Sequence, residues 1–193
     1  MLTTRRLAGL LDALDGAPWG AASGRRHARE EGGAPALYTP EERRRRDASP
    51  WTMVQGVLAP IQFLVFLGSL ALVLRYLATG DGFAIATCSV VVKTLVLYAI
   101  MVTGCIWEKD VFGRYLFAPA FYWEDMFSML VLALHTAYLG AVFAGLGEAR
   151  GQMLLALAAY AAYLVNAVQF VLKLRAARRQ EARSMALGGM RAT

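Results

Sequence analysis

The sequence predicts an all-α integral membrane protein, a bundle of four transmembrane helices with both termini in the cytoplasm. Hydrophobic residues make up 58% of the 193-residue chain, whereas roughly 45–50% is typical of soluble domains. Four apolar runs reach the length of about 20 residues that a helix needs to cross a bilayer; they are residues 54–77, 83–107, 126–146 and 152–174. Basic residues gather before the first run and after the last, which places both chain ends on the cytoplasmic side.

The spans and their flanks divide the chain into three parts. Residues 1–37 are rich in Gly, Ala and Arg and are expected to form a disordered or weakly helical extension. Residues 38–180 form the four-helix transmembrane domain, and residues 181–193 are expected to be a disordered tail. At the start of the domain, Thr39 suits the N-cap of a short helix and Pro40 suits its first position.

Polar residues recur at every seventh position of the first span, at Gln55, Gln62, Ser69 and Tyr76. This spacing places them near one helical face, and in lipid such a face is expected to contact other helices or a cavity. The stripe therefore either forms hydrogen bonds within the bundle or contacts a substrate. Gln62 is the candidate substrate-binding residue of this set.

Two ionisable residues lie deep in the apolar runs. Lys93 in the second span is a functional group or half of a buried pair, unless its long side chain reaches toward the loop at residues 80–82. His135 lies in the third span, where helical periodicity places it on the same face as Glu124 and Ser128. Two interpretations of His135 stay open: a role in catalysis, or a hydrogen-bonded contact between helices.

The segment between the second and third spans, from Trp107 to Asp125, concentrates charged and aromatic residues: WEKDVFGRYLFAPAFYWED. Its nineteen residues hold four carboxylates, two cations and seven aromatic rings, far more than a connection between helices requires. On the predicted topology the segment faces the cytoplasm. A carboxyl group beside Trp and Phe rings in a partly dry site becomes a usable proton donor near neutral pH. The segment is therefore the candidate site, either for acid and base chemistry or for binding a planar substrate with a carboxylate.

Common motifs for nucleotide, metal and nucleophile chemistry are absent from the sequence, including the P-loop, GxGxxG, GxSxG, HExxH and zinc-type cysteine patterns. Haem ligation between membrane helices would need two histidines there, and only His135 lies in a span. No cofactor and no metal site of the protein's own are therefore expected. A nucleic-acid partner is not expected either, because membrane orientation already explains the basic tails.

Three contiguous strings of the chain are distinctive: YTPEERRRRDASPWTMVQGVLAPIQFLVFL, VVKTLVLYAIMVTGCIWEKDVFGRYLFAPAFYWEDMF and LALHTAYL. They resemble the 3-vinyl bacteriochlorophyllide hydratase family of bacteriochlorophyll biosynthesis, over about residues 38–178. The resemblance implies an enzyme that adds water across the 3-vinyl group of chlorophyllide a or 3-vinyl bacteriochlorophyllide, giving a 3-(1-hydroxyethyl) group. It also implies a photosynthetic bacterium, its cytoplasmic or intracytoplasmic membrane, and other enzymes of bacteriochlorophyll biosynthesis as partners.

Under this resemblance, the reaction begins with protonation of the terminal vinyl carbon, and water then adds to the carbon attached to the ring. Glu124 or Glu108 is the candidate proton donor, and Asp125 is the candidate base that orients the water. His135 either ligates the magnesium of the pigment or relays a proton to Glu124. The candidate substrate-binding residues are Arg114 or Lys109 for the ring propionate, the aromatic residues Trp107, Tyr122 and Trp123, and Gln62.

Alternatives from other functional classes follow from the same residues. A non-catalytic membrane carrier or assembly factor for a chlorophyll-type pigment would use the aromatic and cationic groups but would not need the carboxylates. A small transporter would need a polar pathway through both leaflets, for which Lys93 is the candidate. Four helices give a small bundle, so a homo-oligomer with the pocket between its subunits is a further alternative.

Overall fold

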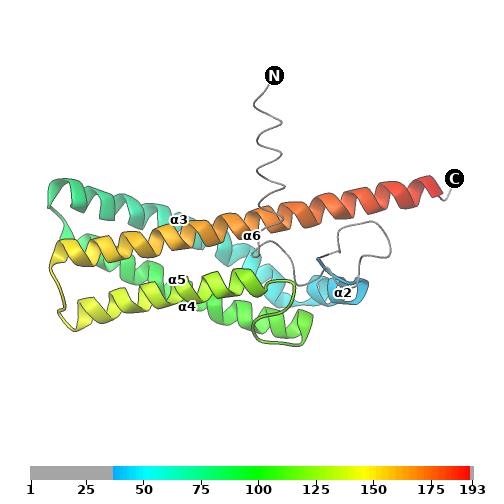
Figure 1. The fold of residues 1–193 in the computed structure, drawn as a ribbon, viewed down its shortest axis with the longest axis horizontal. Coiled ribbons are helices and arrows are strands. Elements are labelled where there is room, and N and C mark those ends of the chain that lie inside the picture. The colour runs from blue at the N-terminus through cyan, green and yellow to red at the C-terminus, as the bar shows by residue number, and fades with distance from the viewer. Residues whose placement is uncertain (1–36, 192–193) are drawn as a thin grey trace, which may run out of the picture.

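The computed structural model of the protein describes residues 37–191, so most of the predicted N-terminal extension lies outside the described residues. Within this range the structure is helical and contains no strand. The helices are α2 (Pro40–Ala48), α3 (Pro50–Thr79), α4 (Phe83–Phe112), α5 (Tyr122–Phe143) and α6 (Ala149–Arg191) (Figure 1). Helices α3 to α6 are long and apolar enough to cross a membrane. The all-α class is thus confirmed, together with four helices of the length and apolarity that the sequence predicts for membrane spans.

Helix α2 begins as the sequence predicts. The Thr39 side chain accepts a hydrogen bond from the Glu42 N–H, and the Glu42 side chain accepts one from the Thr39 N–H, a reciprocal capping arrangement that satisfies two free donors. Pro40 occupies the first helical position, where its missing N–H costs nothing. Ser49 then separates α2 from α3, so the short basic helix leads directly into the first span.

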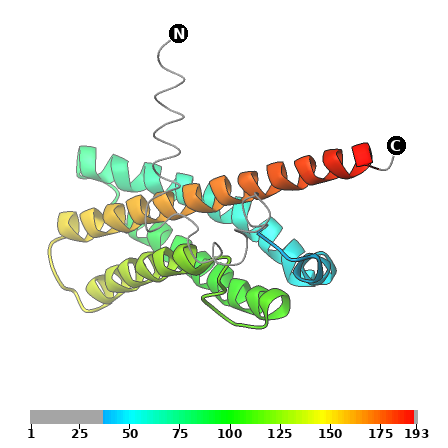
Figure 2. The ribbon, with the colours of Figure 1, turned by 45° about the vertical axis from the view of Figure 1, so that its right-hand side comes forward.

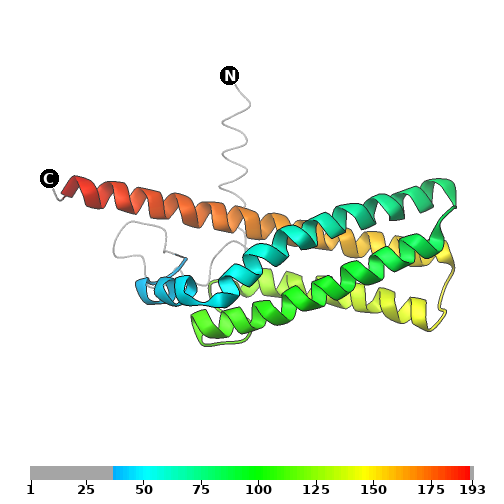
Figure 3. The same ribbon diagram turned by 180° about the vertical axis from the view of Figure 1, so that it is seen from behind.

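The four long helices form two antiparallel hairpins, α3 with α4 and α5 with α6 (Figures 1 and 3). Within each hairpin the helices pack closely along their length, whereas fewer contacts join one hairpin to the other. The tight α3–α4 turn has Gly80 and Gly82 in left-handed conformation, with φ of 79° and 85°, which glycine adopts without steric cost. Both hairpin turns lie at one end of the bundle, and α2 and the α4–α5 connection lie at the other.

The apolar core runs between the two hairpins, and aromatic rings form its centre. The Phe66 ring of α3 contacts the rings of Tyr160 and Tyr163 of α6, at centroid distances of 5.4 Å and 4.9 Å. Large apolar side chains such as Leu64 and Leu95 point outward and are exposed. An apolar exterior around a partly polar interior is the arrangement expected of a bundle in lipid.

The helices extend beyond the apolar runs that predicted them. Helix α4 ends at Phe112 rather than at residue 107, and α5 begins at Tyr122 rather than at residue 126. Hydropathy marks only the part of a helix that crosses hydrocarbon, so charged turns at either end are not counted. These extra turns carry the candidate carboxylates, which therefore lie on helices rather than in a loop.

Helix α6 continues to Arg191, past the predicted end of the fourth span at residue 174. It projects beyond the other helices at the end of the bundle that holds α2 (Figure 2). The structure is thus helical over most of 181–193, where a disordered tail is expected from the sequence. Residues 175–187 are mostly Ala, Arg, Gln, Glu, Leu and Met, which favour a helix even without apolar packing.

Candidate active site

Two carboxyl groups meet at the end of the bundle where α4 ends and α5 begins. Glu108 lies in the last turns of α4 and Asp125 in the first turn of α5, and both are buried, with 6% and 5% of their surface exposed. Their side chains are close enough to influence each other directly. Two carboxyl groups in one buried site repel each other when both are ionised, so such a site favours keeping one proton. Glu108 and Asp125 therefore form a carboxyl pair suited to holding one proton.

The α4–α5 connection holds the carboxyl pair with two successive backbone N–H groups. The Phe117 N–H donates to Asp125 Oδ2 at 2.8 Å, and the Ala118 N–H donates to Glu108 Oε2 at 3.4 Å. A short bond from an N–H favours the ionised form of a carboxyl group, which places the shared proton on Glu108. Phe117 has a φ of 59°, an uncommon conformation for a residue with a side chain. Such backbone conformations cluster at functional sites.

Glu124 lies beside the pair but has a different partner. Its Oε2 accepts a bond from Lys173 Nζ of α6 at 2.6 Å, and both side chains are largely buried. Lys173 Nζ also lies 4.9 Å from the centre of the Phe121 ring. Glu124 is therefore held as an ion pair rather than as a proton donor. Sequence reasoning assigned Lys173 no role at the site, because a lysine at the end of a predicted span is also explained by membrane orientation.

An aromatic cluster packs under these charges, around the Phe121 ring. Trp107, Phe112 and Phe170 contact this ring, with centroid distances of 5.7–5.9 Å. The Trp107 indole N–H donates to Thr52 Oγ1 at 2.9 Å, so this residue ties α4 to α3. The cluster therefore packs against Lys173, the partner of Glu124, whose Nζ lies over the Phe121 ring.

The other predicted substrate-binding residues of this segment lie nearer the surface. Tyr122 is exposed and its ring contacts the half-buried Trp123 ring at 5.6 Å. Arg114 and Lys109 are both exposed, and Lys109 Nζ donates to the Gly113 carbonyl at the end of α4. The structure thus brings the carboxylates together in a buried cluster and leaves the two cations outside it.

The structure buries Lys93 and His135 completely, as a pair near the middle of the bundle, with 0% of either residue exposed. Lys93 Nζ lies 2.6 Å from His135 Nε2, and His135 Nδ1 lies 2.8 Å from the Val131 carbonyl oxygen. Since a carbonyl only accepts, Nδ1 carries the ring proton and Nε2 accepts from the lysine. Lys93 also lies 4.2 Å from the centre of the Tyr163 ring.

This pairing corrects one interpretation of the sequence. Lys93 does not reach toward the loop at residues 80–82, because it is fully buried and its side-chain nitrogen contacts His135. His135 lies on the buried face of α5 with Glu124 and Ser128, as predicted. Both of its ring nitrogens contact protein groups, so its roles as a magnesium ligand or a proton relay stay predictions.

The polar stripe of α3 faces other helices, as predicted, and two of its members have a structural role. Gln55 donates to Thr103 Oγ1 at 2.7 Å, and the Ser69 hydroxyl is hydrogen-bonded to that of Tyr160 at 2.6 Å. Gln62 is different. It is buried, with 2% exposed, and neither of its side-chain polar atoms has a hydrogen-bond partner among the described residues.

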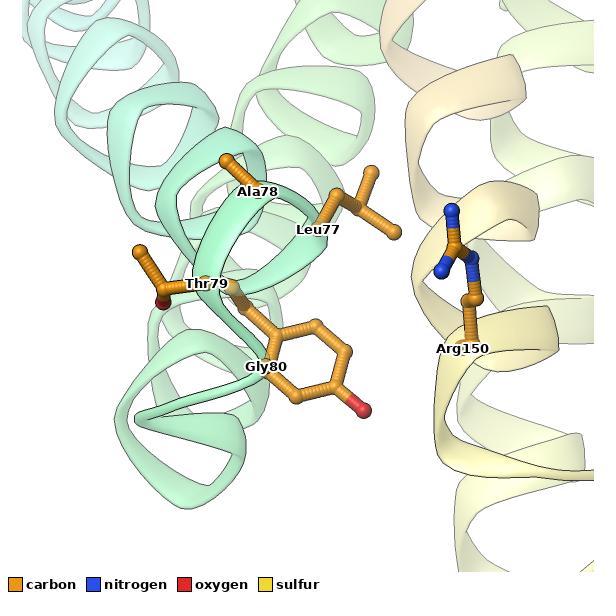
Figure 4. A pocket seen from close by; sticks show the side chains of 6 residues that line it. Leu77, Ala78, Thr79, Gly80 and Arg150 are labelled. Atoms are coloured by element: carbon orange, nitrogen blue, oxygen red, sulfur yellow. The ribbon is translucent and has the colours of Figure 1, made fainter.

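Elsewhere the structure offers little that suggests a second site. Among the described residues, no group of three or more His, Cys, Asp or Glu side chains could hold a metal ion. A shallow pocket lies between the end of α3 and the start of α6, lined by Leu77, Gly80 and Arg150 among others (Figure 4). It lies at the end of the bundle opposite the carboxylates and contains no carboxylate of its own.

Residues 38–176 match the family model described as 2-vinyl bacteriochlorophyllide hydratase. A curated relative of that description from Rhodobacter capsulatus is 65% identical over 147 residues, which cover 76% of this chain and 85% of the relative. Another, from Cereibacter sphaeroides, is 66% identical over 143 residues, covering 74% of this chain and 88% of the relative. No solved structure matches the chain.

Proposed function

This chain belongs to the 2-vinyl bacteriochlorophyllide hydratase family, and we propose that it adds water to the vinyl group of chlorophyllide a or 3-vinyl bacteriochlorophyllide. The product carries a 3-(1-hydroxyethyl) group; the numbers 2 and 3 denote the same vinyl substituent in two ring-numbering conventions. The observation that supports this chemistry best is the pair of neighbouring buried carboxyl groups, Glu108 and Asp125; in this proposal Glu108 carries a proton and Asp125 is ionised. The reaction is that of a hydro-lyase and needs no oxidant or reductant.

Glu108 is the proton donor in this proposal. Its O–H bond breaks as a new C–H bond forms at the terminal vinyl carbon, and the vinyl π electrons supply that bond. Positive charge then develops on the carbon attached to the ring, where conjugation with the macrocycle spreads it. Buried carboxylates of Asp125 and Glu124 near this position favour the developing cation, because charges interact strongly where water is excluded.

Asp125 completes the addition as the general base. As a water oxygen bonds to the ring-attached carbon, Asp125 accepts a proton from that water. The proton then passes from Asp125 to the neighbouring Glu108, so the enzyme is regenerated and the net change is one added water. Sequence reasoning left Glu108 and Glu124 as alternative proton donors. We assign Glu108, because Glu124 accepts a hydrogen bond from Lys173.

Substrate binding is proposed at the same end of the bundle. Arg114 and Lys109 are exposed close to the carboxyl pair in sequence, where either could pair with the ring propionate. The Tyr122 and Trp123 rings lie at the outer edge of the site and suit a planar, apolar macrocycle. Trp107 supports the site from within the aromatic cluster.

The membrane orientation is part of the proposal. Exposed arginines of α2 and of α6 after residue 174 lie at the end of the bundle that holds the carboxyl pair. The positive-inside rule assigns this end, and with it both termini, to the cytoplasm. A bacterial cytoplasmic or intracytoplasmic membrane is the expected location, with other enzymes of bacteriochlorophyll biosynthesis as partners that supply and accept the pigment.

The experiment that tests this function incubates the detergent-solubilised protein with chlorophyllide a, alongside the Glu108→Gln variant. For the wild type we expect a blue-shifted red absorption band and a mass gain of one water. The variant is expected to bind the pigment and leave its mass unchanged. A folded wild-type protein that binds the pigment without altering it would contradict the hydratase assignment and favour the carrier.

A further inference from the structure

We propose that Asn166 of α6 ligates the central magnesium of the pigment through its amide oxygen. This inference rests on the proposed function, because it assumes that a magnesium chlorin is the substrate. Magnesium in a planar macrocycle has an open axial position, and Mg²⁺ prefers hard oxygen ligands. The histidine that the sequence suggests for this task, His135, has both ring nitrogens engaged by Lys93 and Val131.

Amide oxygens that lack a partner lie between the carboxyl pair and the Lys93–His135 pair. Among the described residues, Asn166 Oδ1, Gln169 Oε1 and both polar atoms of Gln62 are buried without a hydrogen-bond partner. Buried polar atoms in folded proteins nearly always have partners, so each such atom is a candidate contact for a ligand. Three of these four atoms are oxygen acceptors, which suits a cation or a water bound to one.

Asn166 is the member whose oxygen is oriented by the fold. It is 9% exposed, and its Nδ2 donates to Ser128 Oγ of α5 at 2.9 Å. That bond fixes the amide plane and turns Oδ1 away from Ser128, as expected when one side of an amide is anchored. An anchored oxygen loses little conformational freedom when it binds a ligand.

The position of Asn166 also fits the reacting end of the pigment. Its anchor Ser128 lies three residues after Asp125 in α5, a rise of about 4.5 Å along the helix. This rise is smaller than the radius of the macrocycle. A pigment whose vinyl group lies at Glu108 and Asp125 would therefore have its centre near Asn166. Gln62 lies at the same level on the other hairpin. The ring of Phe66, one turn after Gln62 in α3, contacts the ring of Tyr163. Tyr163 in turn lies one turn before Asn166 in the antiparallel α6. The two amides thus lie at the same level on facing hairpins, and in this proposal the pigment binds between them.

The test compares chlorophyllide a with its magnesium-free form, in which two protons replace the metal. Both are titrated into the full-length protein in detergent, and the ratio of the two Kd values is measured. We expect the wild type to bind the magnesium form at least about tenfold more tightly. Asn166→Leu is expected to bind both forms about equally. The matched control is Gln55→Leu, which removes a partly buried amide whose Nε2 is hydrogen-bonded and should keep the wild-type ratio.

A second variant protects the test from a folding defect. Asn166→His replaces the oxygen with a nitrogen that also binds magnesium, so the preference for the metal should persist. The visible bands of the bound pigment that respond to magnesium coordination should shift relative to wild type. Unchanged bands in Asn166→His would overturn the proposal, even if Asn166→Leu does not fold.

Several outcomes would contradict the assignment of Asn166. They are a wild type with no preference for magnesium, a preference that survives in Asn166→Leu, and a preference lost only in Gln62→Leu. Hydration of chlorophyllide a by the wild type is measured in the same samples. If hydration fails, the proposed function is wrong; if hydration succeeds and the preference survives in Asn166→Leu, only the magnesium ligand is wrong.

Discussion

The bundle contains two buried clusters of ionisable side chains, and they differ in what they can still do. At the centre, Lys93 and His135 are fully enclosed, and each ring nitrogen of the histidine has a protein partner. At the end, Glu108 and Asp125 are neighbouring buried carboxyl groups that accept hydrogen bonds from backbone N–H groups of the α4–α5 connection. The central pair joins α4 to α5, and we assign it a structural role. In our proposal the carboxyl pair acts on the substrate, so burial of an ionisable group does not by itself identify a catalytic residue.

The largest expected effect is on turnover, from Glu108→Gln. The amide keeps the shape of the side chain but has no acidic proton, so kcat should fall by about 10²–10⁴-fold, as for loss of a general acid. Pigment affinity should change little. Single-turnover assays with chlorophyllide a measure the rate. Glu41→Gln is the matched control, because Glu41 is an exposed residue whose partner is Arg45, and near-wild-type turnover in Glu108→Gln would contradict the assigned donor.

The central pair should instead determine stability. His135→Leu leaves the Lys93 ammonium buried without its acceptor, so the free energy of unfolding should fall by about 3 kcal/mol. The double variant Lys93→Met/His135→Leu removes the charge as well and should recover most of that loss. Denaturant unfolding in detergent micelles measures both, and the double variant should keep most of its turnover. Loss of turnover in a stable double variant would show that the two clusters are not functionally separate.

A smaller effect is expected from Lys173→Met, which leaves Glu124 as a largely buried carboxylate without its partner. The expected loss is about 1–3 kcal/mol of unfolding free energy, since the pair is partly accessible to solvent. Glu124→Gln in the same chain should restore stability, because it removes the uncompensated charge. Thermal unfolding of the two single variants and the double variant measures the interaction free energy between Lys173 and Glu124. An additive result would mean that the 2.6 Å contact contributes nothing.

The smallest expected effect is from Phe117→Gly. Glycine adopts a φ near 60° without strain but loses more entropy on folding and gives up the contact with the Tyr122 ring. These terms oppose each other, so the unfolding free energy should change by less than about 1 kcal/mol. The Phe117 N–H still donates to Asp125 in this variant, and turnover should persist. A large loss of turnover with unchanged stability would show that the Phe117 ring itself contacts the substrate.

The features that depend on neighbours in sequence were predictable. Four apolar runs gave the four long helices, and Thr39 and Pro40 gave the start of α2. The helix ends near the site were less predictable, because α4 and α5 continue through charged turns that hydropathy does not count. The family was recognisable from contiguous strings, and the match over residues 38–176 agrees with it.

The number of long helices, their polar faces and the segment that concentrates the carboxylates follow from the order of residues along the chain. The partners of the ionisable groups depend on packing: Glu108 lies beside Asp125, Glu124 pairs with Lys173, and His135 contacts Lys93. Periodicity gives the direction of a side chain around its own axis but not the helix that faces it. That choice depends on how the two hairpins pack and on where the α4–α5 connection places its N–H groups, and both arise from contacts far apart in the chain.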